Sequence, residues 1–120
     1  MHFTEQLISF NRAVALDRLG GDEELLKDVA RLFLQEYAQV VAEIRQAIVA
    51  SDAGALQRAA HTLKGSVGNF GAASAVEASR RLEMLGKSGR TEGAAELLDS
   101  LETCMERLLP ELSALVGEPA

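Results

Sequence analysis

The sequence predicts an all-α fold, namely an antiparallel up-down four-helix bundle with a short additional N-terminal helix. Alanine and leucine dominate while aromatic residues make up only 4% of the chain, which favours helices over strands. Apolar side chains recur every three or four residues in four long segments, and the short links between them favour antiparallel neighbours. The length of 120 residues fits one domain, residues 1–120, with its core over about residues 11–116.

The first two predicted helices are separated by a pair of glycines. A short helix over about residues 11–19 is expected to end at Gly20-Gly21, because glycine tolerates left-handed dihedral angles. Asp22 offers a carboxylate cap for a long second helix, whose first turn is acidic. The apolar stripe of this second helix consists of Leu25, Val29, Leu32, Phe33, Tyr37, Val40, Val41, Ile44 and Ile48.

Three more helices complete the predicted bundle. Ser51-Asp52 is expected to cap the third helix, whose apolar stripe consists of Leu56, Ala60, Leu63, Val67 and Phe70. The fourth helix is expected over about residues 72–86, with a loop at residues 87–91 after it. Pro110 should kink or end the last helix, because proline lacks a backbone donor and clashes one turn back.

Charge and cysteine usage exclude several classes of protein. The net charge of −6 argues against a nucleic-acid partner, because duplex-binding domains carry a basic excess. No apolar run approaches the roughly 18 residues of a membrane span, and the chain start lacks the features of a signal peptide. We therefore expect a cytoplasmic protein with no membrane partner. Cys104 is the only cysteine, so we expect a small buried apolar residue and no thiol-ligated zinc site.

The third helix carries the residues that could perform chemistry. With about 100° per residue, His61 lies about 140° from the centre of the apolar stripe, so its imidazole is expected to face solvent. Lys64 lies about 80° from that centre, on the same side of the helix as His61. Gly65 and Gly68 lie about 180° and 120° away, so the polar face also holds two glycines.

The two glycines predict a docking surface. Each one costs the helix roughly 0.5–1 kcal/mol relative to alanine, and a solvated face has no packing need for so small a residue. Gly65 and Gly68 leave a bare strip beside His61, which would let the surface of another molecule approach the imidazole closely.

An exposed imidazole beside an ammonium group is suited to carrying a phosphoryl group. With an ordinary pKa near about 6.5, histidine is largely neutral at pH 7 and offers a nucleophilic nitrogen without a separate base. Lys64 could offset the charge of a phosphoryl group on His61. The alternative is that His61 is a solvated surface residue with no chemical role, as we expect for His2. The two histidines offer no metal-ligand pair, so no metal site is expected.

The sequence around His61 resembles the signature of a known protein family. The run Ala60-His61-Thr62-Leu63-Lys64-Gly65-Ser66, followed by Gly68 and by Phe70-Gly71-Ala72, closely resembles the signature of histidine-containing phosphotransfer (HPt) domains. The runs Leu19-Gly20-Gly21-Asp22-Glu23-Glu24-Leu25-Leu26 and Leu32-Phe33-Leu34 resemble the family's entry into its second helix. Leu82-Glu83 with Leu85-Gly86 resembles its third long helix. The resemblance covers about residues 11–112.

The resemblance implies a specific role for each of these residues. His61 would accept a phosphoryl group from an aspartyl phosphate on a response-regulator receiver domain and relay it to another receiver. Lys64 would steady the phosphate, and Gly65 would leave room for the receiver. The other expected docking residues are Arg58, Gly68, Leu16 and Leu19.

The resemblance also implies a phosphocarrier with no kinase activity and no cofactor or metal of its own, because the receiver supplies Mg²⁺. The expected partners are receiver domains, with a hybrid sensor histidine kinase as a second candidate, and the chain is expected to be a monomer. Two alternatives stay open: the phosphoacceptor domain of a chemotaxis-type histidine kinase, and a helical bundle that binds a partner while His61 stays unphosphorylated.

Overall fold

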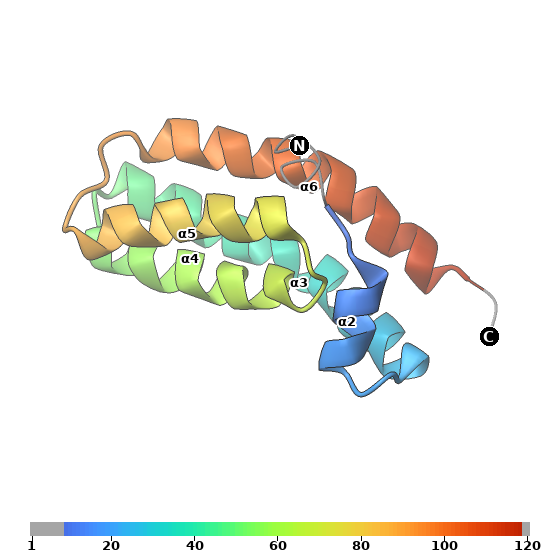
Figure 1. Cartoon of the computed structure of the whole chain (residues 1–120). Coiled ribbons are helices and arrows are strands. Elements are labelled where there is room, and N and C mark those ends of the chain that lie inside the picture. The colour runs from blue at the N-terminus through green and yellow to red at the C-terminus, as the bar shows by residue number, and fades with distance from the viewer. Residues whose placement is uncertain (1–8, 119–120) are drawn as a thin grey trace.

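The computed structural model describes residues 9–118, which form five α-helices and no strand (Figure 1). They are α2 (Arg12–Arg18), α3 (Glu23–Val49), α4 (Ala53–Gly68), α5 (Ala73–Lys87) and α6 (Ala94–Val116). The all-α prediction and the order of the predicted helices are confirmed. Within residues 9–118, none of the helices combines the length and the apolar character that crossing a bilayer requires.

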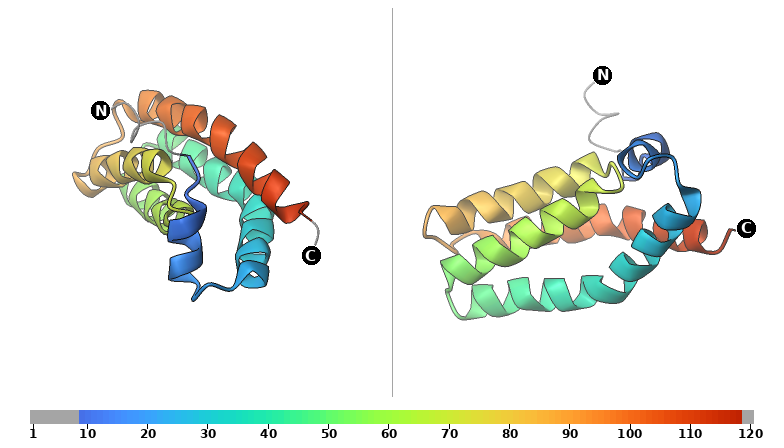
Figure 2. Two further views of the ribbon diagram at one scale, coloured as in Figure 1. Left: turned by 45° about the vertical axis from the view of Figure 1, so that its right-hand side comes forward. Right: turned by 90° about the horizontal axis from the view of Figure 1, so that it is seen from below.

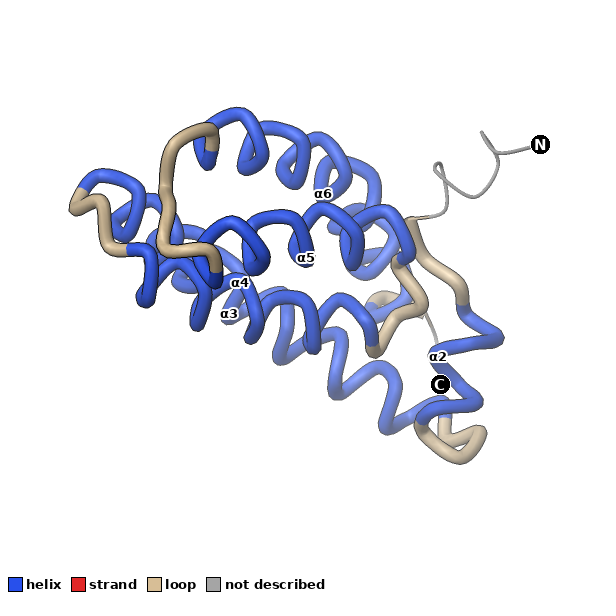
Figure 3. Tube along the Cα trace, turned by 60° about the vertical axis from the view of Figure 1, so that its left-hand side comes forward, coloured by secondary structure: helices blue, strands red, loops and turns tan. Residues whose placement is uncertain are grey.

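The four long helices form a closed ring around one core. Each helix packs against the next along the chain, and α6 returns to pack against α3, so that α4 and α6 stand on opposite sides of the bundle (Figure 2). The links are short, at residues 50–52, 69–72 and 88–93, and consecutive helices run in opposite directions (Figure 3). This is the predicted up-down arrangement.

Three helices begin at the residues that the sequence indicates. The side chains of Asn11, Asp22 and Asp52 each accept a hydrogen bond from the backbone N–H three residues further on, at the starts of α2, α3 and α4. These caps satisfy amide groups that have no partner within the helix. The predicted caps at Asp22 and Asp52 are thereby confirmed.

The core confirms the stripe of α4 but corrects that of α3. All five predicted core residues of α4 and its following turn are fully buried: Leu56, Ala60, Leu63, Val67 and Phe70. On α3, however, Leu25 and Leu32 are 41% and 53% exposed, whereas their neighbours Leu26 and Phe33 are buried. Adjacent helical residues point about 100° apart, so the core takes only one of each neighbouring pair. The other leucine lies on a flank that no helix covers.

Two expectations for α6 are also modified. Pro110 lies inside the helix, which runs on to Val116, so the proline does not end it. Instead, the ribbon of α6 changes direction along its length (Figure 1), in agreement with the kink that a missing donor produces. Cys104 is half-buried rather than buried, and this burial raises the pKa of its thiol.

The short helix α2 crosses the end of the bundle where α4 stops and α5 begins (Figures 1 and 3). The Asn11 N–H donates to the Phe70 carbonyl oxygen over 2.9 Å, which ties α2 to the α4–α5 turn. Gly71 in that turn has a φ of +59°, and a β-carbon there would lie 2.8 Å from Cβ of Asn11 and 2.9 Å from Cβ of Val14. Glycine is therefore required at position 71 for two reasons: the backbone conformation of the turn, and the close packing of α2 against it.

The helices α4 and α5 approach each other closely at Gly86. A β-carbon at this position would lie 2.7 Å from both the Ala53 carbonyl oxygen and the Gln57 backbone nitrogen. These are main-chain atoms and cannot rotate away. Gly86 therefore sets the distance between the two helices.

Replacing Gly86 by alanine should destabilise the bundle, although alanine is the better helix former. We expect the overlap with the α4 backbone to lower the free energy of unfolding by about 1–3 kcal/mol in urea denaturation. Gly65→Ala is the matched control, because a β-carbon at Gly65 meets nothing within 4 Å. That control should gain about 0.5–1 kcal/mol. Equal effects of the two substitutions would contradict the close approach.

Candidate functional site

His61 lies in the middle of α4 on its outward face, with 67% of its side chain exposed. The position follows from the apolar stripe, because Leu56, Leu63 and Val67 take the opposite side of the helix into the core. The solvent-facing orientation predicted for His61 is confirmed.

Glu83 on α5 holds both His61 and Lys64 with one carboxylate. Its Oε2 lies 2.6 Å from Nδ1 of His61, and its Oε1 lies 2.6 Å from Nζ of Lys64. Only 13% of the Glu83 side chain is exposed, so this carboxylate sits between the two helices below the imidazole. The Glu83 carboxylate therefore links His61 and Lys64, the two residues that the sequence predicts to take part in the chemistry.

The charge of Glu83 determines which nitrogen of His61 carries a proton. The hydrogen bond from Lys64, with a further contribution from His61, lowers the pKa of the Glu83 carboxyl group below its usual value. Glu83 is thus ionised at neutral pH, and an ionised carboxylate can only accept hydrogen bonds. The Nδ1 atom of His61 must then be the donor, and in the neutral ring Nε2 keeps its lone pair.

The sequence prediction missed the contribution of Glu83 to the site, but the sequence contains a signal for it. Glu83 follows Ala72 by eleven residues and His61 precedes Ala72 by eleven, so a tight antiparallel turn near Ala72 places them at the same level. The packing of Gly86 against Ala53 and Gln57 fixes the same register. Counting outward from the turn therefore points to Glu83.

The two glycines differ in their surroundings. A β-carbon at Gly65 would meet nothing within 4 Å, so the bare surface predicted beside His61 is present there. A β-carbon at Gly68 would lie 3.9 Å from a methyl group of Val76 and 4.0 Å from the Arg18 guanidinium. The open strip thus extends across Gly65 and is bordered at Gly68 by α5 and α2.

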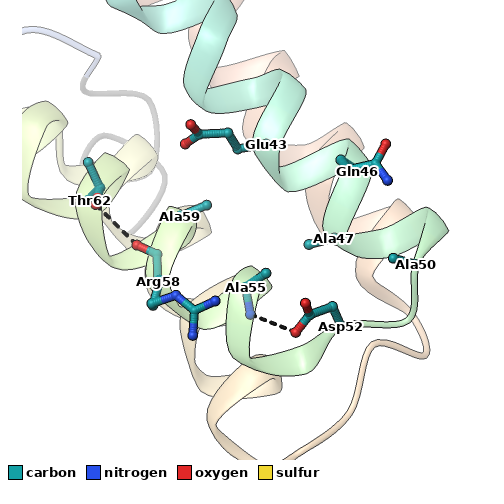
Figure 4. Close-up of a pocket in the computed structure, with 9 residues that line it drawn as sticks. All are labelled: Glu43, Gln46, Ala47, Ala50, Asp52, Ala55, Arg58, Ala59 and Thr62. Carbon is teal, nitrogen blue, oxygen red and sulfur yellow. Dashed lines mark hydrogen bonds between the residues drawn. The ribbon is translucent and has the colours of Figure 1, made fainter.

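The remaining predicted docking residues lie on either side of His61. Arg58 is exposed one turn before His61, and its guanidinium extends back along α4 toward the start of that helix (Figure 4), 3.3 Å from where a β-carbon at Gly54 would lie. Leu16 on α2 and Leu19 at its C-terminal cap are half-buried against the core, and Gly68 is about 10 Å beyond His61 along α4. The structure therefore places Arg58 one turn from His61, whereas the α2 side chain that borders the strip at Gly68 is Arg18.

Among residues 9–118, no group of three or more His, Cys, Asp and Glu side chains is arranged to hold a metal ion.

The fold and the site together describe a helical bundle that presents one imidazole, with its Nε2 lone pair outward, on an open surface. A family model described as the Hpt domain matches residues 28–111, and the chain belongs to this family. Hpt domains carry out histidine phosphotransfer in phosphorelays and generally interact with receiver domains. Comparisons with curated proteins and with solved structures gave no significant match.

Removing the charge of Glu83 should make stability less dependent on pH. Because folding lowers its pKa, ionised Glu83 stabilises the native state above the unfolded pKa, near about 4.3, and this contribution is lost as the pH falls further. Glu83→Gln should therefore be less stable than the parent at pH 7, and this deficit should shrink as the pH falls to 3, as measured by urea denaturation.

Glu106→Gln is the control for this measurement, because Glu106 is exposed on α6, away from the site. It should match the parent at both pH values. A stability deficit of Glu83→Gln that stays constant between pH 7 and pH 3 would contradict the ionic role of Glu83.

Proposed function

We propose that this Hpt domain accepts a phosphoryl group on Nε2 of His61 from the aspartyl phosphate of a receiver domain and passes it to a second receiver. The observation that carries this proposal is the 2.6 Å contact between Nδ1 of His61 and the Glu83 carboxylate. It fixes the imidazole so that its nucleophilic nitrogen points away from the bundle, toward an incoming partner.

The proposed transfer forms one bond and breaks one bond. The Nε2 lone pair forms a bond to phosphorus while the bond from phosphorus to the aspartyl oxygen breaks, so the receiver regains its carboxylate. The imidazole ring becomes positively charged, and Glu83 stabilises this charge through Nδ1–H. The reverse reaction with another receiver returns the phosphoryl group. The Mg²⁺ ion of the reaction belongs to the receiver.

Lys64 is placed to balance the charge of the transferred group. Its ammonium lies one turn beyond His61 and is 2.6 Å from the Glu83 carboxylate. A phosphoryl group on His61 adds negative charge beside that carboxylate, and Lys64 would reduce the repulsion between the two. We propose that it acts by electrostatic support and forms no bond to phosphorus.

The proposed docking surface includes apolar side chains on α3. Leu25 and Leu32 precede Glu43 and Ala50 by eighteen residues, which is five helical turns, so each pair lies at about the same angle. Glu43 and Ala50 face α4, and Leu25 and Leu32 therefore continue the α4-facing flank toward α2. Exposed leucines in this position favour a partner that buries them.

The substitution His61→Gln tests the acceptor. We expect it to abolish transfer from a phosphorylated receiver with Mg²⁺, measured as acid-labile, alkali-stable phosphate on the chain. The free energy of unfolding should change little, because most of the side chain is in solvent. If the folded variant still became labelled with phosphate, His61 would be excluded as the acceptor. Labelling of the parent by a kinase and ATP alone would instead assign the chain to the chemotaxis-type alternative.

The substitution Lys64→Ala tests the electrostatic support. We expect the transfer rate to fall about 10-fold or more while transfer remains measurable, because the acceptor nitrogen is still present. Lys87→Ala is the control, because Lys87 is exposed at the far end of α5. An unchanged rate in Lys64→Ala would remove the lysine from the proposed mechanism.

A further inference from the structure

A groove of about 490 Å³ lies between α5 and α6, two helices that pack side by side (Figure 1). Arg81 in its lining precedes Glu83 by two residues, which is about 200° around α5, so this groove and His61 lie on opposite flanks of that helix. The lining residues that matter below are Glu77, Arg81, Leu97, Ser100 and Cys104. We call it the α5/α6 groove.

The charged side chains of the groove already have partners. Glu77 accepts hydrogen bonds from Arg80 over 2.7 Å and from Arg81 over 3.2 Å. Leu97 and Cys104 are half-buried, so part of their apolar surface is still open toward the groove. An occupant of the groove is therefore recognised through apolar side chains rather than through charge.

The described part of the chain begins on the flank of α6 that lines this groove. The Ser9 hydroxyl donates a hydrogen bond to the Glu111 carboxylate. Glu111 follows Cys104 by seven residues, or two helical turns, so the two residues lie on the same flank of α6 about 10 Å apart. Ser100 continues this flank one turn further. Ser9 is thus held two turns of α6 from the groove.

The chain heads toward the groove when it is followed backward from α2. Arg12 pairs with Glu118, beyond the end of α6, over 2.9 Å. Ser9 contacts Glu111, which lies seven residues earlier. From Arg12 back to Ser9, the chain therefore passes along α6 from its end toward its middle. The same direction leads next to Cys104.

The eight residues that come before this point have the length and the apolar side chains to fill the groove. Eight residues span about 12 Å as a helix and up to about 28 Å when extended, so they reach the level of Cys104 in either conformation. Phe3 and Leu7 are four residues apart, a spacing that places two side chains on one face of a helix and also on one face of a strand.

We propose that residues 1–8 of the same chain fill the α5/α6 groove, with Phe3 and Leu7 against Leu97 and Cys104. Burial of these side chains removes apolar surface of both the segment and the groove from water. The short connection through Ser9 gives the segment a high local concentration, so it outcompetes a separate molecule with similar side chains. The α5/α6 face is then closed, and partners approach the bundle from its other faces.

The first test uses Cys104 as a probe, because it is the only cysteine and it lines the groove. The double substitution Phe3→Ser with Leu7→Ser should raise the rate at which iodoacetamide alkylates Cys104 at least 5-fold at pH 8. The matched control is His2→Ser with Gln6→Ser, which has the same spacing but lies off the apolar face and should react at the parent rate. Equal rates in the parent and the Phe3/Leu7 variant would overturn the proposal.

Two further rates distinguish the proposed cover from other causes of protection. Val41→Ala lowers stability from the core side of α3, which does not line the groove, and it should leave the alkylation rate unchanged. An equal rise in this variant would show reaction through unfolding and would overturn the proposal. The parent rate should also be the same at protein concentrations that differ 100-fold. A rate that falls with concentration would assign the groove to a second copy of the chain instead.

The second test pairs Cys104 with a cysteine placed in the segment. A disulfide requires Cα atoms within about 7 Å, so the apolar position that lies on Cys104 should form it best. Effective concentrations are measured against glutathione for Phe3→Cys and Leu7→Cys and for their neighbours His2→Cys and Gln6→Cys. At least one apolar position should exceed its neighbour 10-fold. A segment outside the groove would give each neighbouring pair equal values, because the connecting lengths are nearly the same, and that result would overturn the proposal.

Discussion

The close packing of α4 against α5 is the constraint on which the site depends. Gly86 brings the two backbones together, and the left-handed Gly71 turns the chain so that the helices return in one register. Only in this register does Glu83 lie beneath both His61 and Lys64. The orientation of the imidazole is therefore a consequence of helix packing, and no loop is needed to hold it.

The two sides of α4 have opposite requirements. Its inner side supplies three fully buried large residues, Leu56, Leu63 and Val67, and the stability of the helix comes mainly from this tertiary packing. Its outer side can therefore tolerate Gly65, a poor helix former that leaves the approach to His61 open. A helix with less burial on its inner side could not keep such an open surface and remain ordered.

Local sequence determines much of this fold, because caps and apolar stripes act within a few turns. Periodicity and capping predict the helices, the buried side of α4 and the exposure of His61. They do not predict that Leu25 and Leu32 are exposed, since that depends on where neighbouring helices end. Nor do they reveal Glu83 as a partner of His61, because the pair is joined only through the packing of two helices.

Ion pairs help to attach α2, whereas the rest of the bundle is held together mainly by buried apolar side chains. Arg12 forms ion pairs over 2.9 Å with both Glu23 and Glu118, and so links α2 to α3 and to the segment after α6. These groups lie near the surface, where dissolved ions screen their attraction, whereas burial of apolar side chains does not weaken with salt. Ionic strength thus acts on the attachment of α2 and leaves the core largely unaffected. The chain thus combines a salt-sensitive attachment of α2 with a salt-insensitive scaffold.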